Sequence, residues 1–414
     1  QASEPGGQQG EHSENGEHGE RGPVVVLGTV DLTWADLLAA ANADDPSLSS
    51  AAKALLAYAG AGRPVNLVTR TVGERTCPAD GWLTLGAGAR VRAAEHSGDG
   101  SAGCRWAEAA EAGGSAGTAG TAGPANAINA QAVTLTGVLA RTEATTAAVG
   151  RGGVLALTNG DTIPDVGDSA SELLAREDPP DLIIADTVPQ SADPGDTGDA
   201  ADPAGTASTA GSAPDASDAD RILALAAALE PLADAPAGTR VVVASVADAT
   251  DPGPQLAILP PGTSSPLKTS TGLLVGPSTH RRGLIQLTDL APALFLGVTG
   301  QKPGPYWSQP LEIAPELREQ PTDGALGTGS VSSGVSQARP LADDALHAQA
   351  SQRANVPAGL VLIGAALALG LAAARVLRAP RAATDEEPQA ATSEEPQPAT
   401  SGRAGGKRPR PVTA

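Results

Sequence analysis

The chain has 414 residues and a formal net charge of −20, with 27 Lys and Arg against 47 Asp and Glu. This acidic balance argues against nucleic acid as a partner, because few cations are present to match the phosphate charge. With 50 Gly, 35 Pro, one Phe and no Met, the core must be built from Ala, Val, Leu and Ile, and we expect one domain of about 200–250 residues.

The first predicted elements follow a polar leader. Residues 1–22 are rich in Gly and Glu and are expected to be disordered. Pro23 opens the run VVVLGTV, which is typical of a buried parallel strand. The next segment, DLTWADLLAAA, spaces its apolar residues as a helix does. A helix over 47–59 and a strand over 65–71 follow.

Two low-complexity insertions interrupt the middle of the chain. Residues 98–124 are rich in Gly, Ala, Ser and Thr, and residues 191–218 are rich in Asp, Pro and Gly. Between them the sequence predicts a strand over 153–157, a helix over 168–176 and a buried strand over 181–186.

The alternation of elements then continues to the end of a domain over 23–300. The sequence predicts a helix over 220–232, strands over 240–246 and 255–259, and a capped helix over 288–298. Strands that alternate with helices indicate an α/β fold with a mostly parallel central sheet flanked by helices. In such sheets the chemistry lies at the carboxyl ends of the strands.

An uncharged segment stands near the C-terminus. Residues 301–355 are expected to form a Pro/Gly/Ser stalk, which contains one short amphipathic stretch. Residues 356–374, VPAGLVLIGAALALGLAAA, are then free of charge, and as a helix they are long enough to cross a hydrocarbon core of ~30 Å. The sequence therefore predicts one transmembrane helix, with a buried Ala/Leu core helix as the alternative.

Flanking charge orients this predicted span. Arg375, Arg378 and Arg381 follow it directly, whereas only Arg353 stands close before it. By the positive-inside rule the disordered tail 375–414 is cytoplasmic and the N-terminal domain lies outside the cell membrane.

The chain contains two cysteines, Cys77 and Cys104. An extracytoplasmic location favours a disulfide between them. The alternative is a pair of independent buried thiols. Two cysteines alone cannot make a zinc site.

Four segments resemble, in order, the alkaline phosphatase/nucleotide phosphodiesterase superfamily and its bacterial membrane-linked members. GPVVVLGTVDLTWADLL resembles the first strand and helix, and RTCPADGWLTLGAG resembles the segment that carries the nucleophile. Residues 220–248 are similar to the helix and strand before the Ser-Asp-His-Gly motif. PSTHRRGLIQLTDLAPAL is similar to a stretch found in the membrane-linked members.

The resemblance implies an alkaline-phosphatase-like domain with a metal-dependent phosphoryl-transfer site. Thr76 stands at the nucleophile position, and Asp31, Asp186, Asp248 and His280 are the candidate ligands of one divalent metal, Zn²⁺, Mn²⁺ or Mg²⁺. The alternatives are a turn threonine beside a disulfide and ordinary Asp capping at strand ends.

The chain also departs from the superfamily pattern. Val30 stands where the metal-binding Asp is expected, and Asp31 comes one position later. The segment 245–248 lacks the His of its motif, and of the five His in the chain only His280 falls inside a recognisable motif. Two-metal phosphoryl transfer needs several imidazoles, so we expect a degenerate domain without catalysis.

The sequence therefore predicts a membrane-anchored extracytoplasmic protein that binds rather than hydrolyses. Its expected partner is an envelope lipid or glycan phosphate, or a membrane protein. Arg281 and Arg282 beside His280 are the predicted anion-binding residues, with a solvated basic turn as the alternative. The competing hypothesis is an active metal-dependent phosphodiesterase or phosphatase that uses Thr76.

Overall fold

The computed structural model divides the chain into two compact units, Gln1–Ala354 and Asn355–Ala414. It describes residues 21–69, 75–91, 134–159, 163–188, 217–250, 252–266, 273–304, 307, 310–313 and 329–378, without the side chains of 352–359, 376 and 378. Most of the predicted leader, insertion 98–124, residues 191–216 of the second insertion and the tail beyond residue 378 lie outside the described residues.

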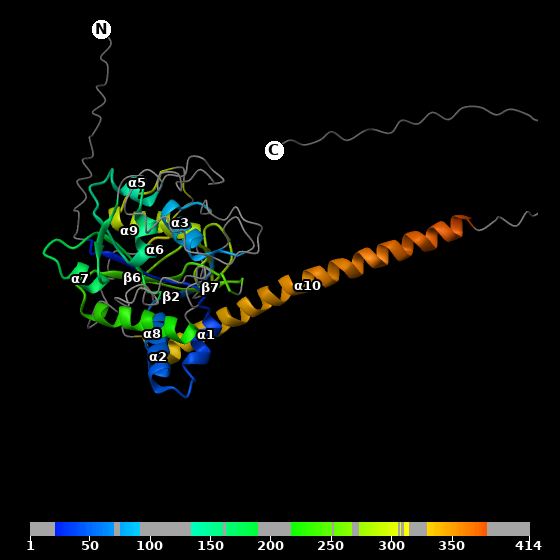
Figure 1. Cartoon of the computed structure of the whole chain (residues 1–414), viewed down its shortest axis with the longest axis horizontal. Coiled ribbons are helices and arrows are strands. Elements are labelled where there is room, and N and C mark those ends of the chain that lie inside the picture. The colour runs from blue at the N-terminus through cyan, green and yellow to red at the C-terminus, as the bar shows by residue number, and fades with distance from the viewer. Residues whose placement is uncertain are drawn as a thin grey trace, which may run out of the picture. The chain divides into compact units, whose positions relative to one another are not determined.

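One eight-stranded sheet forms the centre of the first unit (Figure 1). Its strands are β1 Val24–Thr29, β2 Arg63–Val68, β3 Thr146–Val149, β4 Asp165–Gly167, β5 Leu182–Asp186, β6 Arg240–Ser245, β7 Gln255–Leu259 and β8 Leu284–Gln286. The strand order is β4-β3-β5-β1-β6-β7-β2-β8. Only β7 is antiparallel to its neighbours, so the predicted mixed α/β fold with a mostly parallel sheet is confirmed.

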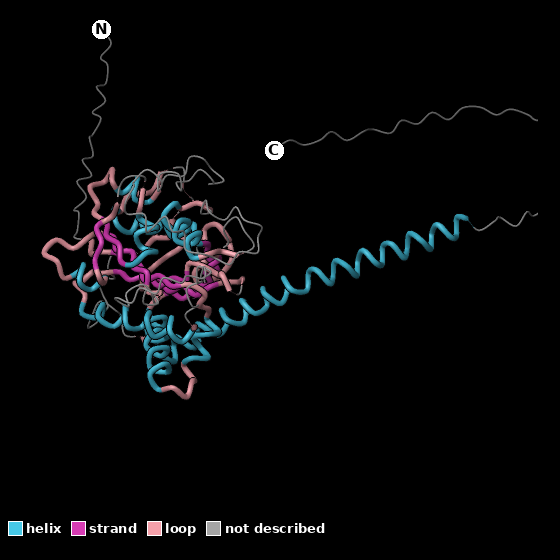
Figure 2. Tube along the Cα trace, viewed as in Figure 1, coloured by secondary structure: helices cyan, strands magenta, loops and turns pink. Residues whose placement is uncertain are grey.

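Helices cover both faces of this sheet (Figure 2). Those of the described residues are α1 Trp34–Ala40, α2 Pro46–Ala61, α3 Pro78–Ala87, α5 Leu135–Leu139, α6 Gly150–Leu157, α7 Ala170–Leu174, α8 Asp218–Leu229, α9 Leu290–Thr299 and α10 Val331–Arg378, with 3₁₀ turns at Glu230–Asp234 and Leu287–Asp289.

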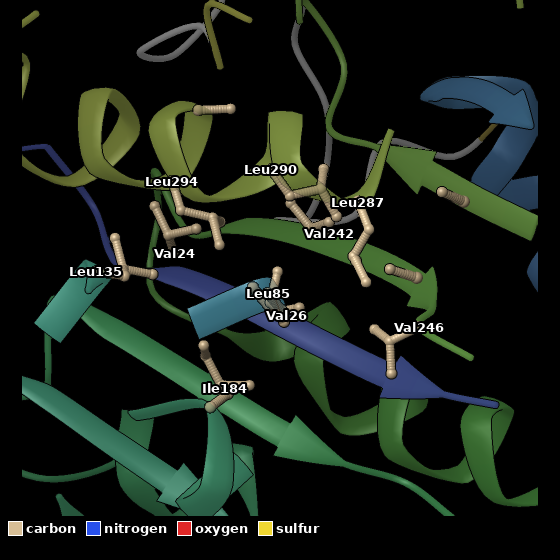
Figure 3. Packing of buried hydrophobic residues seen from close by; sticks show 14 of the residues in the cluster. Val24, Val26, Leu85, Leu135, Ile184, Val242, Val246, Leu287, Leu290 and Leu294 are labelled. Atoms are coloured by element: carbon tan, nitrogen blue, oxygen red, sulfur yellow. The ribbon is translucent and has the colours of Figure 1, made fainter. Parts of the chain in front are cut away.

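The first core lies between the sheet and helices α3, α5, α6 and α9 (Figure 3). Val24 and Val26 of β1 point into it, together with Leu85 of α3 and Leu294 of α9. Each such fully buried side chain contributes roughly 1.5–3 kcal/mol relative to its exposed state. The apolar β-branched run of β1 is explained by this packing.

The second core lies on the opposite face, under α1, α2, α7, α8 and the beginning of α10. Val25 and Leu27 of β1 point into it, because alternate residues of a strand face opposite sides of the sheet. Both faces of β1 are therefore buried, which is typical of a parallel strand covered by two helix layers.

Two elements on the first face differ from the sequence prediction. Residues 153–157, predicted as a strand, belong to α6, and the strand β3 comes just before them. Helix α3 was not predicted, since Gly81 and Gly86 weaken its helical pattern. Both glycines are needed for packing, because a Cβ on Gly81 would lie 2.1 Å from the Val246 carbonyl oxygen and one on Gly86 would lie 1.9 Å from that of Ala156.

The predicted stalk also differs from the structure, because α10 begins within it at Val331. Residues 331–349, here called the inner section, pack against the second core through buried Ala338, Leu341 and Ala342. The side-chain amide of Asn66 in β2 donates to the Leu341 carbonyl at 2.9 Å. Most of the buried residues of the inner section are alanines, so its buried face gives only a weak hydrophobic pattern in the sequence.

Residues 360–375 of α10, here called the outer section, belong to the second unit and expose their apolar side chains. Leu360 is 66% exposed and Leu369 is 72% exposed. Among the described residues we find no helix that is both long and apolar enough to span a membrane. The predicted span 356–374 begins within residues whose side chains lie outside the described set.

Candidate functional site

The predicted carboxylates follow the carboxyl ends of three adjacent strands, β5, β1 and β6. Gly28 of β1 pairs with Asp186 of β5, and Thr29 pairs with Ser245 of β6. Asp31 lies two residues beyond β1, and its backbone N–H donates to the Ala247 carbonyl at 2.9 Å. The fold thus assembles these residues at one edge of the sheet, here called the carboxyl edge.

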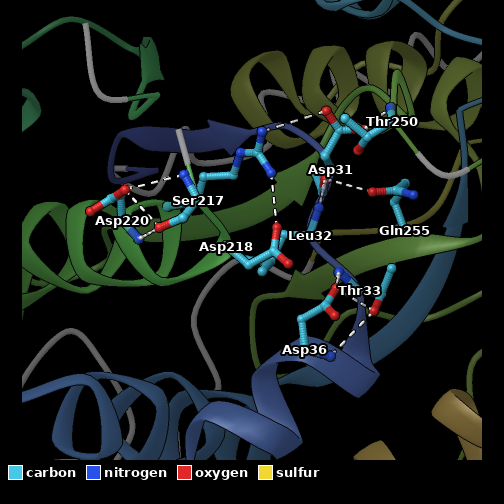
Figure 4. A network of polar contacts seen from close by, with 11 residues as sticks. Asp31, Leu32, Thr33, Asp36, Ser217, Asp218, Asp220, Thr250 and Gln255 are labelled. Atoms are coloured by element: carbon cyan, nitrogen blue, oxygen red, sulfur yellow. Dashed lines mark hydrogen bonds and ion pairs between the residues drawn. The ribbon is translucent and has the colours of Figure 1, made fainter. Parts of the chain in front are cut away.

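Asp31 is buried, and its carboxylate interacts with other groups of the protein (Figure 4). One of its oxygens, Oδ1, accepts the backbone N–H of Thr250 at 2.9 Å. The other, Oδ2, lies 3.7 Å from Nη2 of Arg221, and both side chains are only 6% exposed. Arg221 reaches the site from α8, where it also pairs with Asp218 at 2.9 Å. A guanidinium therefore stands beside the carboxylate at the end of β1.

Arg221 was not singled out in the sequence analysis. It is the single cation in the segment DADRILALAAAL, next to the buried Ile222. A lone basic residue at the start of an apolar helix face is the one signal by which it could have been found.

Asp248 and Thr76 are joined by direct contacts. The Thr76 backbone N–H donates to Asp248 Oδ1 at 2.7 Å, and the Gly253 N–H donates to Oδ2 at 3.2 Å. Burial raises the pKa of Asp248 above its usual value, while these N–H groups and the hydroxyls of Thr76 and Thr69 act in the opposite direction. The fully buried Thr76 hydroxyl donates to the Thr69 carbonyl at 2.9 Å.

Asp186 holds the N-terminus of α6. Its Oδ2 accepts the Gly152 N–H at 2.9 Å and its Oδ1 accepts the Val188 N–H at 3.0 Å. Burial raises the pKa of Asp186 to about 6, against the lowering effect of these two donors and of the Arg151 charge. This carboxylate therefore interacts with a helix terminus, where negative charge is favourable.

The indole of Trp82 fills the space beside β1 on the first face. A Cβ added to Gly28 would lie 2.0 Å from its ring, and one added to Gly152 would lie 2.2 Å from it. The ring is fully buried and its Nε1 finds no hydrogen-bond partner among the described residues, so close packing is retained at the expense of a hydrogen bond there. Side-chain packing thus occupies the sheet face next to Asp186.

A polar chain stands where the superfamily motif was expected to end β6. The Leu32 N–H donates to Ser245 Oγ at 3.0 Å, and that hydroxyl donates to Gln255 Oε1 at 3.0 Å. The Gln255 amide donates in turn to the Gly253 carbonyl at 3.2 Å. These contacts tie β1, β6 and β7 together within the protein.

His280, Arg281 and Arg282 lie elsewhere. They form an exposed turn before β8, with the His280 backbone at φ 52°. Strand β8 is separated from β1 by β6, β7 and β2, which at ~4.8 Å per strand is about 19 Å. The structure therefore does not bring His280 together with Asp31 and Asp186.

Two further findings concern metals and cysteines. Over the described ranges, no group of three or more His, Cys, Asp or Glu is placed to hold a metal ion. Cys77, the N-cap residue of α3, is disulfide-bonded. Its predicted partner, Cys104, lies outside the described residues, so that pairing stays a prediction.

Comparison of the sequence with protein-family models and with curated proteins gives no match. The resemblance to the phosphatase superfamily therefore stays a prediction from the four sequence segments.

Proposed function

We propose that this chain is a membrane-anchored, extracytoplasmic binding protein built on a degenerate alkaline-phosphatase-like domain that does not catalyse hydrolysis. The observation that carries this proposal is the state of the candidate carboxylates. Both oxygens of Asp31 and both oxygens of Asp248 interact with groups of the protein itself.

A divalent metal is held through the lone pairs of carboxylates, together with water or imidazole. At Asp31 the positive charge beside the carboxylate is the Arg221 guanidinium, which is buried with it. At Asp248 two backbone N–H groups use the oxygens. Arg221 and the backbone donors therefore supply the charge compensation that a metal ion would otherwise provide.

Thr76, the candidate nucleophile, also makes its contacts within the protein. Attack on phosphorus requires a hydroxyl activated by a metal or by a base. The Thr76 hydroxyl donates to the Thr69 carbonyl, and His280 lies in the turn before β8, a strand about 19 Å from β1. These contacts support a structural role for Thr76 beside the disulfide-bonded Cys77.

Membrane anchoring is supported by the outer section of α10. A helix that is apolar on every side requires an apolar environment, in a protein core or in a membrane. Leu362 and Leu371 are 71% and 67% exposed, and Arg375 ends this section. We propose that residues 356–374 cross the cell membrane, with the N-terminal domain outside.

The proposed ligand is phosphate-bearing and belongs to the envelope, as a lipid or a glycan. The exposed guanidinium groups of Arg281 and Arg282 support this chemistry, since arginine binds phosphate through paired N–H groups. The alternative partner that we propose for the same domain is a membrane protein.

One observation favours the competing function of a metal-dependent phosphodiesterase. The fold brings Thr76, Asp31 and Asp248 to one loop region, because Asp248 contacts Thr76 while Thr250 contacts Asp31. A rearrangement that frees these carboxylates would create a candidate metal site with Thr76 beside it.

The test uses the full chain in detergent with bis(nitrophenyl) phosphate, with and without Zn²⁺, Mn²⁺ or Mg²⁺. We expect no turnover above that of the Thr76→Ala variant, and no metal retained on elemental analysis. Thr263→Ala is the matched control, because that buried hydroxyl also donates to a backbone carbonyl, at 2.8 Å. Metal-dependent turnover that is lost in Thr76→Ala and kept in Thr263→Ala would overturn the proposal.

A further inference from the structure

The inner section of α10 follows β2 from one end to the other. A Cβ on Gly334 would lie 1.8 Å from the Leu56 carbonyl oxygen, near the end of α2 and therefore near the start of β2. Leu341 accepts from Asn66 in the middle of β2. A Cβ on Gly253 would lie 2.7 Å from Gln349 Nε2.

The last of these contacts lies at the carboxyl edge. Gly253 comes two residues before β7, and Gln255 of β7 pairs with Leu67 near the end of β2. Since β7 runs antiparallel, its beginning lies at the edge where the parallel strands end. The chain therefore leaves the first unit beside the loop that joins β6 and β7, which carries Asp248 and Thr250.

Chain length limits how far this loop can lie from a membrane. Residue 356, the start of the proposed span, lies seven positions after Gln349. As a continuous helix they cover ~10 Å, and even fully extended they cover at most ~25 Å. This limit holds for any path of the chain beyond residue 354.

We propose that the carboxyl edge of the sheet lies against the lipid surface, and that Arg75 binds headgroup phosphate there. The inference rests on the membrane anchor proposed above. Arg75 is exposed, and its Nη1 donates to the Ala249 carbonyl at 3.5 Å, which places it on the β6–β7 loop. A guanidinium has five N–H donors, so this contact leaves others for phosphate.

Two acidic groups of this edge, Asp31 and Asp248, do not oppose this contact as free charges. Asp31 is paired with Arg221, and Asp248 accepts two backbone N–H groups. Both carboxylates are buried, so neither presents a bare charge to the lipid surface. The exposed turn at Arg281 and Arg282 precedes the edge strand β8 and is left for other anionic ligands.

The test measures the depth of two positions at opposite ends of β6. The full chain is labelled with a fluorophore at Ala249→Cys or at Ala237→Cys, and is inserted into phosphatidylcholine vesicles that contain headgroup spin-labelled lipid. Ala237 is exposed and precedes the start of β6, whereas Ala249 follows its end. Because six strand residues span ~20 Å, we expect quenching at Ala249 to exceed that at Ala237 by about threefold or more.

A second measurement tests Arg75. Added phosphatidylglycerol should increase quenching at Ala249, and Arg75→Gln should abolish that increase. Equal quenching at the two positions in vesicles that retain the chain after carbonate washing would overturn the orientation and leave the anchor standing. Loss of the chain on washing would overturn both, and an unchanged response in Arg75→Gln would overturn the headgroup contact.

Discussion

The carboxyl edge of the sheet and the outer section of α10 depart from ordinary protein surfaces in opposite ways. At the carboxyl edge, charged side chains are buried, as with Asp31 and Arg221 at 6% side-chain exposure. In the outer section, large apolar side chains are exposed, as with Leu367 at 64%. Buried polar groups and contiguous exposed apolar groups are the informative exceptions to the usual distribution of residues.

The two regions differ in whether their unusual side chains find interaction partners within the protein. The described charges Asp31 and Asp248 at the carboxyl edge find their partners inside the protein. The described side chains of the outer section have no such cover from other described residues. The comparison teaches that the first region is held together by contacts within the domain, whereas the second leaves its apolar surface exposed.

The largest expected effect comes from breaking the buried ion pair. Arg221→Met leaves the Asp31 carboxylate buried without its countercharge, and we expect a loss of about 3–5 kcal/mol in the free energy of unfolding. Denaturant unfolding of the full chain in detergent measures this loss.

The double variant Asp31→Asn/Arg221→Met is the control, because it removes both charges and keeps an oxygen for the Thr250 N–H. We expect it to recover most of the lost stability. A single Arg221→Met variant as stable as the parent would show that the pair does not hold the carboxyl edge together.

The second prediction concerns the outer section. Leu367→Asp places a charge near the middle of the proposed span, at a cost of about 3 kcal/mol for insertion. We expect the carbonate-resistant membrane fraction to fall sharply, while unfolding of the N-terminal domain stays unchanged. Leu346→Asp, at a 55% exposed position of the inner section, should leave membrane retention intact.

The third prediction compares two glycines of the same helix. A Cβ on Gly334 would meet the Leu56 carbonyl oxygen at 1.8 Å, whereas nothing lies within 4 Å of a Cβ on Gly364. We expect Gly334→Ala to cost about 2 kcal/mol of domain stability through overpacking. Gly364→Ala should cost none, since alanine favours the helix. Similar denaturation midpoints for the two variants would contradict the docking of the inner section.

The last prediction is a gradual pH dependence at the carboxyl edge, which amounts to about 1 kcal/mol over any single pH unit. The folded-state pKa of Asp186 is raised to about 6 from its usual value of about 4, so the folded state binds more protons between these values. Stability should therefore rise as the pH falls from about 6 to about 4, by about 1 kcal/mol per pH unit.

Asp186→Asn should remove this component, which is measured as the difference between the two unfolding profiles over that pH range. Residues 360–374 of the outer section contain no titratable group, so they should add nothing to it. Parallel profiles for Asp186→Asn and the parent would contradict the burial of this carboxylate.

Much of the sheet was predictable from local patterns. The runs of β1, β5, β6 and β7 are apolar because helices cover both faces of these strands, and β7 Gln255–Leu259 matches its predicted bounds. Helix α8 was also predicted, although it begins at Asp218, two residues earlier than expected, and ends at Leu229, three residues earlier.

Helix α3 was not predictable, because two of its residues are glycines that allow distant backbone segments to pack closely against it. Gly81 and Gly86 of α3 weaken a helix in isolation, yet the backbones of Val246 and Ala156 leave no room for a Cβ there. The short run at residues 153–157 fits either a strand or a helix by its apolar pattern alone.

The amino-acid sequence by itself determined the α/β alternation, the position of the carboxylates after strand ends and the uncharged segment near the C-terminus, because each depends on neighbouring residues along the chain. Only the tertiary structure decided that Arg221 stands beside Asp31, 190 positions earlier, and that α10 packs along β2. Contacts between residues so far apart depend on how the layers pack, which no local periodicity records.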